Sequence, residues 1–161
     1  MAKHQIELRV NENTYSRTVD SALNLVDFLR NELGLKGTHI GCEHGVCGAC
    51  TVLVDQKTVR ACLMLAVQAQ GMHVQTIESI ANADGSMSEI QLKMKEHHGL
   101  QCGFCTPGVV MTIKELMAES KGLALSEAQV RTALSGNLCR CTGYQGMVDA
   151  ALDLINHSLA Q

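Results

Sequence analysis

Apolar and polar residues alternate at the start of the chain, and this period of two predicts a β-hairpin. The alternation runs through residues 5–10 and resumes over residues 15–19. Between the two runs, Asn11-Glu12-Asn13 supplies residue types that favour a turn. The first two elements are therefore expected to be antiparallel strands.

The pattern then changes to helical spacing. Apolar residues recur near that spacing at Leu25, Phe28, Leu29 and Leu33. Asp20 or Ser21 is the predicted N-cap, because both side chains can accept a hydrogen bond from the first turn. Gly34 is the predicted stop. One amphipathic helix is expected after the hairpin.

A second strand-rich stretch follows the first cysteines. Residues 51–54 and 57–61 predict strands on either side of a turn at Asp55-Gln56. Residues 63–70 have a helical pattern, and residues 72–75 return to that of a strand. The order of hairpin, helix, glycine-rich loop and second hairpin is typical of a β-grasp, ferredoxin-like domain.

From about Glu78 the strand signals give way to helical periods separated by Gly, Ser and Asn. One predicted helix spans residues 88–98, and another begins at Thr106-Pro107, with Thr106 as N-cap and proline in the first turn. Ser126-x-x-Gln129 is a capping box for a third helix, and residues 148–159 form a fourth. Four short helices predict a compact bundle.

These elements place the chain in the α+β class. We expect a β-grasp, ferredoxin-like domain over residues 1–77 and an all-α, four-helix-bundle domain over residues 78–161. What each domain binds depends on the cysteines.

The eight cysteines fall into two groups of four. The first group is Cys42, Cys47, Cys50 and Cys62, and the second is Cys102, Cys105, Cys139 and Cys141. The first has C-x4-C-x2-C followed by a distant fourth cysteine, the plant-type spacing for a [2Fe-2S] cluster held by four thiolates. The second has C-x2-C, a long gap and C-x-C. All eight are candidate metal ligands, and they predict two one-electron centres.

The residues around the cysteines suit an anionic cluster. Its sulfurs need backbone N–H donors close by and no bulky side chains in the way, which glycine allows. Residues 41–50 place Gly or Ala around three of the predicted ligands. Cys105 and Cys141 stand just before predicted helices, whose positive dipole ends favour an anion.

Zinc is the main alternative for the same cysteines. A four-cysteine zinc site is usually assembled from two short C-x2-C knuckles, whereas the first group has three ligands in one loop and a remote fourth. A Rieske centre requires two histidines, and near Cys42 only His44 is at a suitable spacing. His97 and His98 are interpreted as a solvated helix end, because neighbouring helical residues point in different directions.

Composition narrows the possible partners and the compartment. The formal net charge is −3, no basic run occurs, and the aromatic residues are two Tyr and two Phe, all of which disfavours nucleic acid as a partner. No apolar run approaches the ~18 residues of a membrane span, and the N-terminus lacks the apolar core of a signal peptide. We therefore expect a cytoplasmic protein, where cysteines bind metal rather than form disulfides.

The sequence has no phosphate-binding glycine loop and no nucleophile with an adjacent base, so we identify no catalytic residue. A one-electron relay cannot by itself carry out a two-electron oxidation, and that chemistry requires a cofactor elsewhere. The chain is therefore expected to be a subunit of a larger redox enzyme.

Three stretches carry a family resemblance: residues 41–50, residues 101–108 and residues 136–144. They closely resemble the iron-sulfur small subunit of the molybdenum hydroxylases, the group of xanthine dehydrogenase, aldehyde oxidoreductase and carbon monoxide dehydrogenase. The resemblance extends over essentially the whole chain. It implies an electron-transfer subunit of a molybdenum-containing oxidoreductase.

The resemblance also assigns positions and partners. It implies that the first cysteine group holds the cluster nearer FAD and the second the cluster nearer molybdenum. Gln101 and Cys139 match positions that contact molybdopterin, as its cytosine dinucleotide, on a large subunit. It further implies a medium FAD-binding subunit, or a cytochrome acceptor in its place, and a dimer of heterotrimers. A freestanding two-cluster ferredoxin is the alternative.

Overall fold

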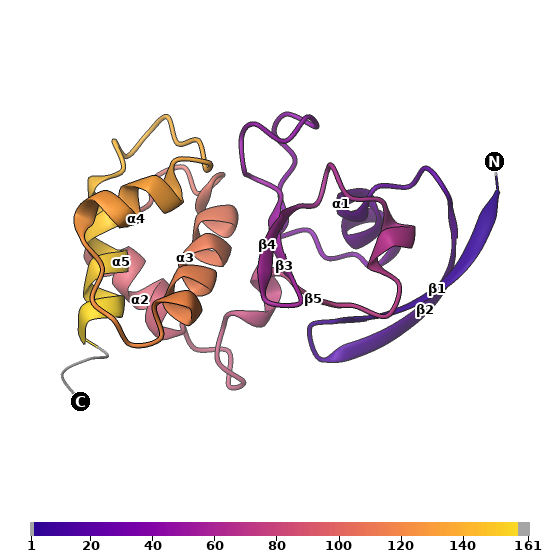
Figure 1. Cartoon of the computed structure of the whole chain (residues 1–161), viewed down its shortest axis with the longest axis horizontal. Coiled ribbons are helices and arrows are strands. Elements are labelled where there is room, and N and C mark those ends of the chain that lie inside the picture. Colours follow the sequence, from indigo (N-terminus) through magenta and orange to yellow (C-terminus); the bar gives the residue numbers. More distant parts are fainter. Residues whose placement is uncertain (1, 158–161) are drawn as a thin grey trace.

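The computed structural model describes residues 2–157. Figure 1 shows a sheet with a short helix at one end of the molecule and a group of helices at the other. The strands are β1 (Lys3–Val10), β2 (Asn13–Asp20), β3 (Thr51–Val54), β4 (Lys57–Arg60) and β5 (His73–Gln75). They form one five-stranded sheet in the order β2-β1-β5-β3-β4, with β1 and β5 parallel and the other pairs antiparallel. The predicted α+β class is confirmed.

The first hairpin follows the alternation of the sequence. In β1, Ile6, Leu8 and Val10 are buried while the residues between them are exposed. Val10 pairs with Asn13 across a turn in which Asn11 has a φ of 54°, a conformation that asparagine tolerates well. The period of two in the sequence therefore places one face of this hairpin against the core.

The helix after the hairpin begins later than the sequence predicts. Regular helix starts with α1 (Leu25–Asp27) and continues as one turn of π-helix, η1 (Phe28–Glu32). The N-cap is Asn24, whose Oδ1 accepts a 2.8 Å hydrogen bond from the backbone N–H of Asp27. The predicted cap at Asp20 is wrong because this residue ends β2 and its carboxylate accepts from Ala22 N–H in a turn.

The helix predicted over residues 63–70 is reduced to a single 3₁₀ turn, η2 (Ala66–Ala69). The backbone before it is held extended by the start of α1. Met64 O accepts from Leu25 N–H at 2.7 Å, and Ala66 N–H donates to Leu23 O at 2.8 Å. These contacts between distant segments outweigh the local helical pattern.

Past the sheet, residues 76–157 contain a 3₁₀ turn and helices. They are η3 (Ile77–Ser79), α2 (Glu89–Glu96), α3 (Thr106–Ser120), α4 (Glu127–Leu134) and α5 (Gln145–His157). The predicted capping box is present, since Gln129 Oε1 accepts from Ser126 N–H at 2.8 Å. Thr106 is the first residue inside α3 rather than its N-cap, which is Cys105. α5 begins three residues before the predicted Val148, and the predicted end at Leu159 lies outside the described residues.

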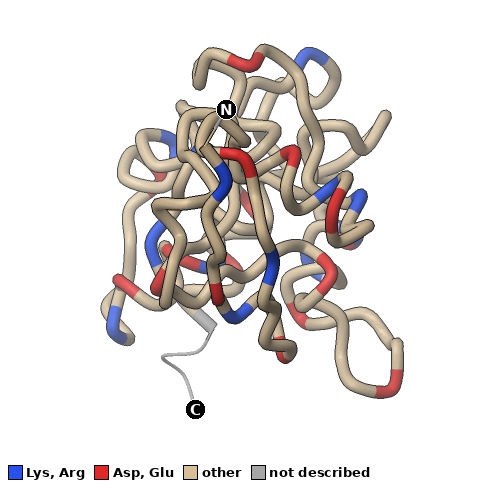
Figure 2. The backbone as a smooth tube through the Cα atoms, turned by 90° about the vertical axis from the view of Figure 1, so that its right-hand side faces the viewer, with Lys and Arg blue, Asp and Glu red and all other residues tan. Residues whose placement is uncertain are grey.

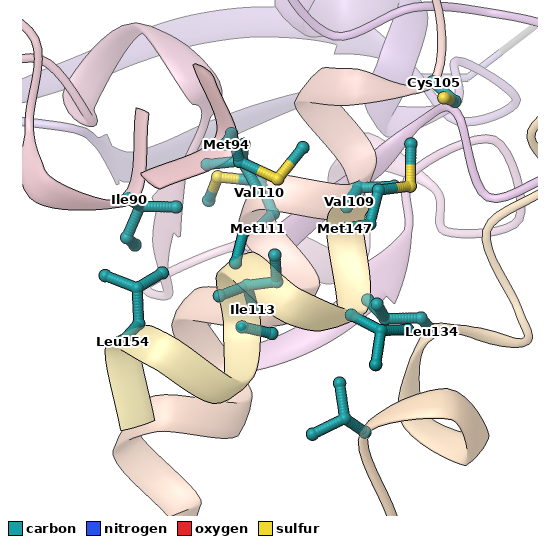
Figure 3. Close-up of a cluster of buried hydrophobic side chains, with 14 of the residues drawn as sticks. Ile90, Met94, Cys105, Val109, Val110, Met111, Ile113, Leu134, Met147 and Leu154 are labelled. Carbon is teal, nitrogen blue, oxygen red and sulfur yellow. The ribbon is translucent and has the colours of Figure 1, made fainter. Parts of the chain in front are cut away.

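The buried side chains form two clusters. One contains β-strand and α1 residues and includes Phe28, Leu29 and Cys50. The other lies among α2, α3, α4 and α5, and Figure 3 shows Met94, Met111 and their neighbours converging there, with Cys105 at the edge. With aromatic residues scarce, Met94, Met111 and Met147 join aliphatic side chains in this second core.

The two groups of elements meet where α3 packs against β3 and β4 (Figure 1). Glu115 Oε1 on α3 accepts from the backbone N–H of Thr58 at 3.1 Å, and Lys57 pairs with Glu119. Cysteine loops from both groups lie beside this contact. Their geometry is therefore tied to the interface between sheet and helices.

Charged residues are dispersed over the described part of the chain. Figure 2 shows Lys and Arg positions interspersed with Asp and Glu along the backbone. Within residues 2–157, no helix is long and apolar enough to cross a membrane.

Candidate metal centres

The first cysteine group lies in the loop before β3 and just after β4. Cys42 and Cys47 are close together, and the backbone N–H of Cys47 donates to Cys42 Sγ at 3.4 Å. This hydrogen bond, helped by the backbone N–H of His44, lowers the pKa of Cys42 to about 6. The loop therefore already provides the N–H donors that stabilise a thiolate.

Cys50 and Cys62 form the second pair of this group. Cys50 is 2% exposed, and its burial raises the pKa of its thiol to about 11; the backbone N–H of Cys62 opposes this rise, and the thiol of Cys62 adds to it. A buried thiol of this kind ionises when a metal replaces its proton. The pair thus fits a metal better than it fits free thiolates.

The second cysteine group repeats this arrangement in the loops before α3 and α5. Cys105 is 8% exposed, and burial together with the side chain of Cys139 raises its pKa to about 12. Cys141 pairs with Cys102, which raises the pKa of Cys141 through a side-chain hydrogen bond. Both members of this outer pair are exposed.

Each group therefore consists of two pairs of cysteines. A [2Fe-2S] cluster has two irons and four thiolates, so two thiolates serve each iron. The paired arrangement fits the two-iron group.

Glycines leave room around the first loop. A Cβ added at Gly41 would lie 3.0 Å from Cys47 Sγ. Gly48 has a φ of 72°, and a Cβ there would lie 2.3 Å from the carbonyl oxygen of Gly136. The first position keeps side chains away from sulfur, and the second lets this loop touch the loop that carries Cys139.

Direct hydrogen bonds join the two cysteine loops. The backbone N–H of Leu138 donates to Cys47 O at 2.8 Å, which connects a residue of the first group to the neighbour of Cys139. His39 and Phe104 provide a second contact, with Nδ1 of His39 2.8 Å from Phe104 O and the two rings stacked. Because a carbonyl only accepts, His39 carries its proton on Nδ1 here.

Asn137 lies at the centre of this contact and is 1% exposed. Its Nδ2 donates to Gly48 O at 3.1 Å, and its Oδ1 accepts from Thr112 Oγ1 at 2.9 Å. Its carbonyl accepts from the hydroxyl of Tyr144, which in turn accepts from the backbone N–H of Cys139. Asn137 thus connects the first loop, α3 and the second loop.

Sequence reasoning identified the cysteines but missed Asn137 and Tyr144. The only local signal was their position just before and just after the C-x-C segment, Cys139 to Cys141. Their roles depend on contacts with residues far away in the chain, such as the 89-residue separation between Asn137 and Gly48. Spacing within one segment cannot reveal such contacts.

The remaining sequence candidates occupy different environments. Gln101 is exposed beside the exposed Cys102, and Cys139 is half-buried. His44 contacts its own loop, with Nδ1 2.5 Å from Cys42 O. His97 is not a fully solvated helix end, because Nε2 lies 2.8 Å from Asp153 Oδ2 and links α2 to α5.

Family models match both halves of the chain. Residues 8–73 match the 2Fe-2S iron-sulfur cluster binding domain, and residues 76–152 match the [2Fe-2S] binding domain. Each matched region contains one of the two cysteine groups.

Related sequences match almost end to end. The caffeine dehydrogenase subunit gamma of Pseudomonas sp. (strain CBB1) is 51% identical over 93% of this chain and 90% of the relative. The nicotine 6-hydroxylase small subunit of Paenarthrobacter nicotinovorans is 48% identical, over 92% and 88%. The xanthine dehydrogenase iron-sulfur-binding subunit of Escherichia coli O157:H7 is 40% identical, over 92% of each.

Solved structures share the fold. Quinoline 2-oxidoreductase from Pseudomonas putida 86 contains a chain with a TM-score of 0.91 and 42% identity, covering 98% of this chain and 96% of that one. The aldehyde oxidoreductase of Desulfovibrio gigas matches with a TM-score of 0.87 and 37% identity. There the match covers 96% of this chain but 17% of the longer one.

Proposed function

Because the chain belongs to the iron-sulfur subunits of the molybdenum hydroxylases, we propose that each cysteine group holds one [2Fe-2S] cluster. The proposed ligands are Cys42, Cys47, Cys50 and Cys62 for the first cluster, and Cys102, Cys105, Cys139 and Cys141 for the second. Support comes from the four cysteine pairs, since two thiolates serve each iron. The boundary between the two domains is proposed at residues 77 and 78.

The chain is an electron-transfer subunit of a molybdenum-containing oxidoreductase. When bound, the clusters supply two sites that each accept and donate one electron. We propose that Gln101 and Cys139 face the molybdopterin cofactor of a large subunit, as its cytosine dinucleotide. The exposure of Gln101 and of its neighbour Cys102 supports this orientation. The residues around Cys42 would then face FAD.

One observation supports electron exchange between the two proposed clusters. The hydrogen bond from Leu138 N–H to Cys47 O connects the two loops that carry proposed ligands of different clusters. It gives electrons a short route between the two proposed clusters, made of two backbone segments and a single hydrogen bond. The clusters would therefore exchange electrons without any movement of the protein.

The chain is one subunit of a multi-subunit dehydrogenase complex. As its finer composition, we propose a large molybdopterin-binding subunit and a medium FAD-binding subunit, assembled as a dimer of heterotrimers in the cytoplasm. A cytochrome acceptor in place of the FAD subunit is the second possibility. Relatives that are named as subunits gamma, beta and small support separate chains for the other cofactors.

Low-temperature EPR of the dithionite-reduced complex tests the proposal, with iron, sulfide and molybdenum counted in the same sample. We expect two distinct [2Fe-2S] signals and larger chains that co-purify with molybdenum. Two signals from a chain without any stable partner would instead favour a freestanding ferredoxin. Zinc without an EPR signal would contradict the iron-sulfur assignment.

A further inference from the structure

Arg60 bridges the two cluster-binding loops, and nothing in the cysteine pattern points to it. It is the last residue of β4 and is half-buried. Its Nη1 donates to Thr51 Oγ1 at 2.5 Å, and its Nη2 donates to Gly136 O at 2.7 Å. One guanidinium thus joins elements from both halves of the chain.

Both acceptors stand close to proposed ligands. Thr51 directly follows Cys50, and its hydroxyl also donates to Gly48 O at 2.6 Å. Gly136 begins the segment that leads through Asn137 to Cys139. A shift of the guanidinium would therefore move the two loops relative to each other.

We propose that Arg60 is a positioning residue that fixes the separation of the two cluster-binding loops and holds a permanent positive charge between them. The inference rests on the ligand assignment proposed above. It adds a function for a side chain outside both cysteine groups.

The forked shape of the side chain is essential to this role. A guanidinium presents several N–H donors in a fixed plane, so it can serve Thr51 and Gly136 at the same time. A lysine ammonium is a compact point charge on a flexible stem and lacks that fixed geometry. Replacement by lysine therefore separates the effect of geometry from the effect of charge.

The charge of Arg60 acts on the reduction potentials. Reduction adds negative charge to a cluster that is already anionic, and a nearby cation stabilises the reduced form. Removing the charge should lower both potentials, whereas moving it slightly should not.

The test uses the full chain with both clusters bound, within the purified complex, and compares Arg60→Lys with Arg60→Met. Two readouts are needed: the magnetic splitting between the two reduced clusters in EPR, which depends steeply on their separation, and the two midpoint potentials from a redox titration. We expect Arg60→Lys to let the two loops move apart. The magnetic splitting should then narrow, with little shift in either midpoint potential. We expect Arg60→Met to narrow the splitting and to shift both potentials downward.

A second variant leaves Arg60 in place. A Cβ at Gly136 would lie 2.6 Å from Arg60 Nη2, so Gly136→Ala should displace the guanidinium while keeping its charge. It should narrow the splitting as Arg60→Lys does. This variant keeps the test available if Arg60→Met fails to assemble its clusters.

The matched control is Lys57→Gln. Lys57 lies at the other end of β4 and pairs across the same interface with Glu119 of α3. Its printed partners in the described structure lie in neither cysteine loop. We expect the magnetic splitting and the two midpoint potentials of Lys57→Gln to equal those of the unaltered protein. Equal effects of Lys57→Gln and Arg60→Met would show only a general interface effect and would overturn the inference.

Two further outcomes are distinguishable. If the unaltered protein gives two coupled signals that none of the Arg60 and Gly136 variants changes, the positioning role is wrong and the proposed function stands. If the unaltered protein lacks two [2Fe-2S] signals, the proposed function fails, and this inference fails with it.

Discussion

At the scale of single residues, Asn137 shows how much a buried polar side chain can determine. It is 1% exposed and bonds to Gly48 O and Thr112 Oγ1. Asn137→Ala removes both hydrogen bonds from the interface, at about 0.5–1.5 kcal/mol each and so about 1–3 kcal/mol together, while Gly48 O and Thr112 Oγ1 keep other partners. We expect a loss of stability in that range, measured by urea unfolding of the cluster-loaded chain.

The matched control for Asn137 is Asn82→Ala. Asn82 is exposed and bonds only within its own turn, to Ser86 Oγ and Met87 O. Its replacement should change the free energy of unfolding by no more than about 0.5 kcal/mol. A similar loss of unfolding free energy for the two variants would show that the burial of Asn137 at the interface adds nothing to stability.

Cys139 distinguishes the two clusters. Cys139→Ser should disturb the cluster proposed at the second cysteine group and stop electron exit from the molybdenum subunit. The EPR signal of the first group should persist, because its four cysteines lie in the sheet domain and Cys139 lies in the helical domain. An unchanged second signal together with full turnover would refute the assignment of Cys139.

At the residue scale, sequence and structure agree best where the chemistry is local. The spacing of Cys42, Cys47 and Cys50 is enough to predict a cluster loop, because one turn of backbone must wrap around one group. Arg60 and Asn137 were not predicted, because their functions come from residues 76 and 89 positions away. A pattern confined to one segment carries no record of such contacts.

At the scale of elements, helices set by local contacts were predicted correctly, and those set by distant contacts were not. The helix that begins after Ser126 was predicted correctly because its capping box is local. The helix over residues 63–70 was wrong because Met64 and Ala66 bond to the start of α1 instead. Elements whose ends are set by distant segments therefore escape prediction from sequence.

The contact between the two cysteine loops is a contact between elements, and a substitution at Gly48 can test it. Gly48 and Gly71 have nearly the same φ, 72° and 75°, so alanine adds a similar backbone strain of ~1–2 kcal/mol at each. A Cβ at Gly48 would collide with Gly136 O at 2.3 Å, whereas one at Gly71 meets nothing within 4 Å. We therefore expect Gly48→Ala to be more destabilising in thermal unfolding. Equal melting temperatures would contradict the close loop contact.

At the scale of the whole molecule, the clusters should act as cross-links. Cys50 belongs to the sheet core and Cys105 to the helical core, and their respective partners, Cys62 and Cys139, come from later segments. Metal binding at such sites contributes directly to folding free energy, because the site does not exist in the unfolded chain. Each core therefore depends on its own cluster.

Cluster removal tests this dependence. Removing iron from the full chain with a chelator under reducing conditions should lower the melting temperature of both cores, measured by circular dichroism and calorimetry. Cys139→Ser should lower mainly the transition of the helical core, because the sheet core keeps its complete set of cysteines. An iron-free chain that melts at the same temperature as the loaded one would show that the two hydrophobic cores suffice. In that case the clusters would serve electron transfer alone, and the buried thiols of Cys50 and Cys105 would be neutral members of the cores.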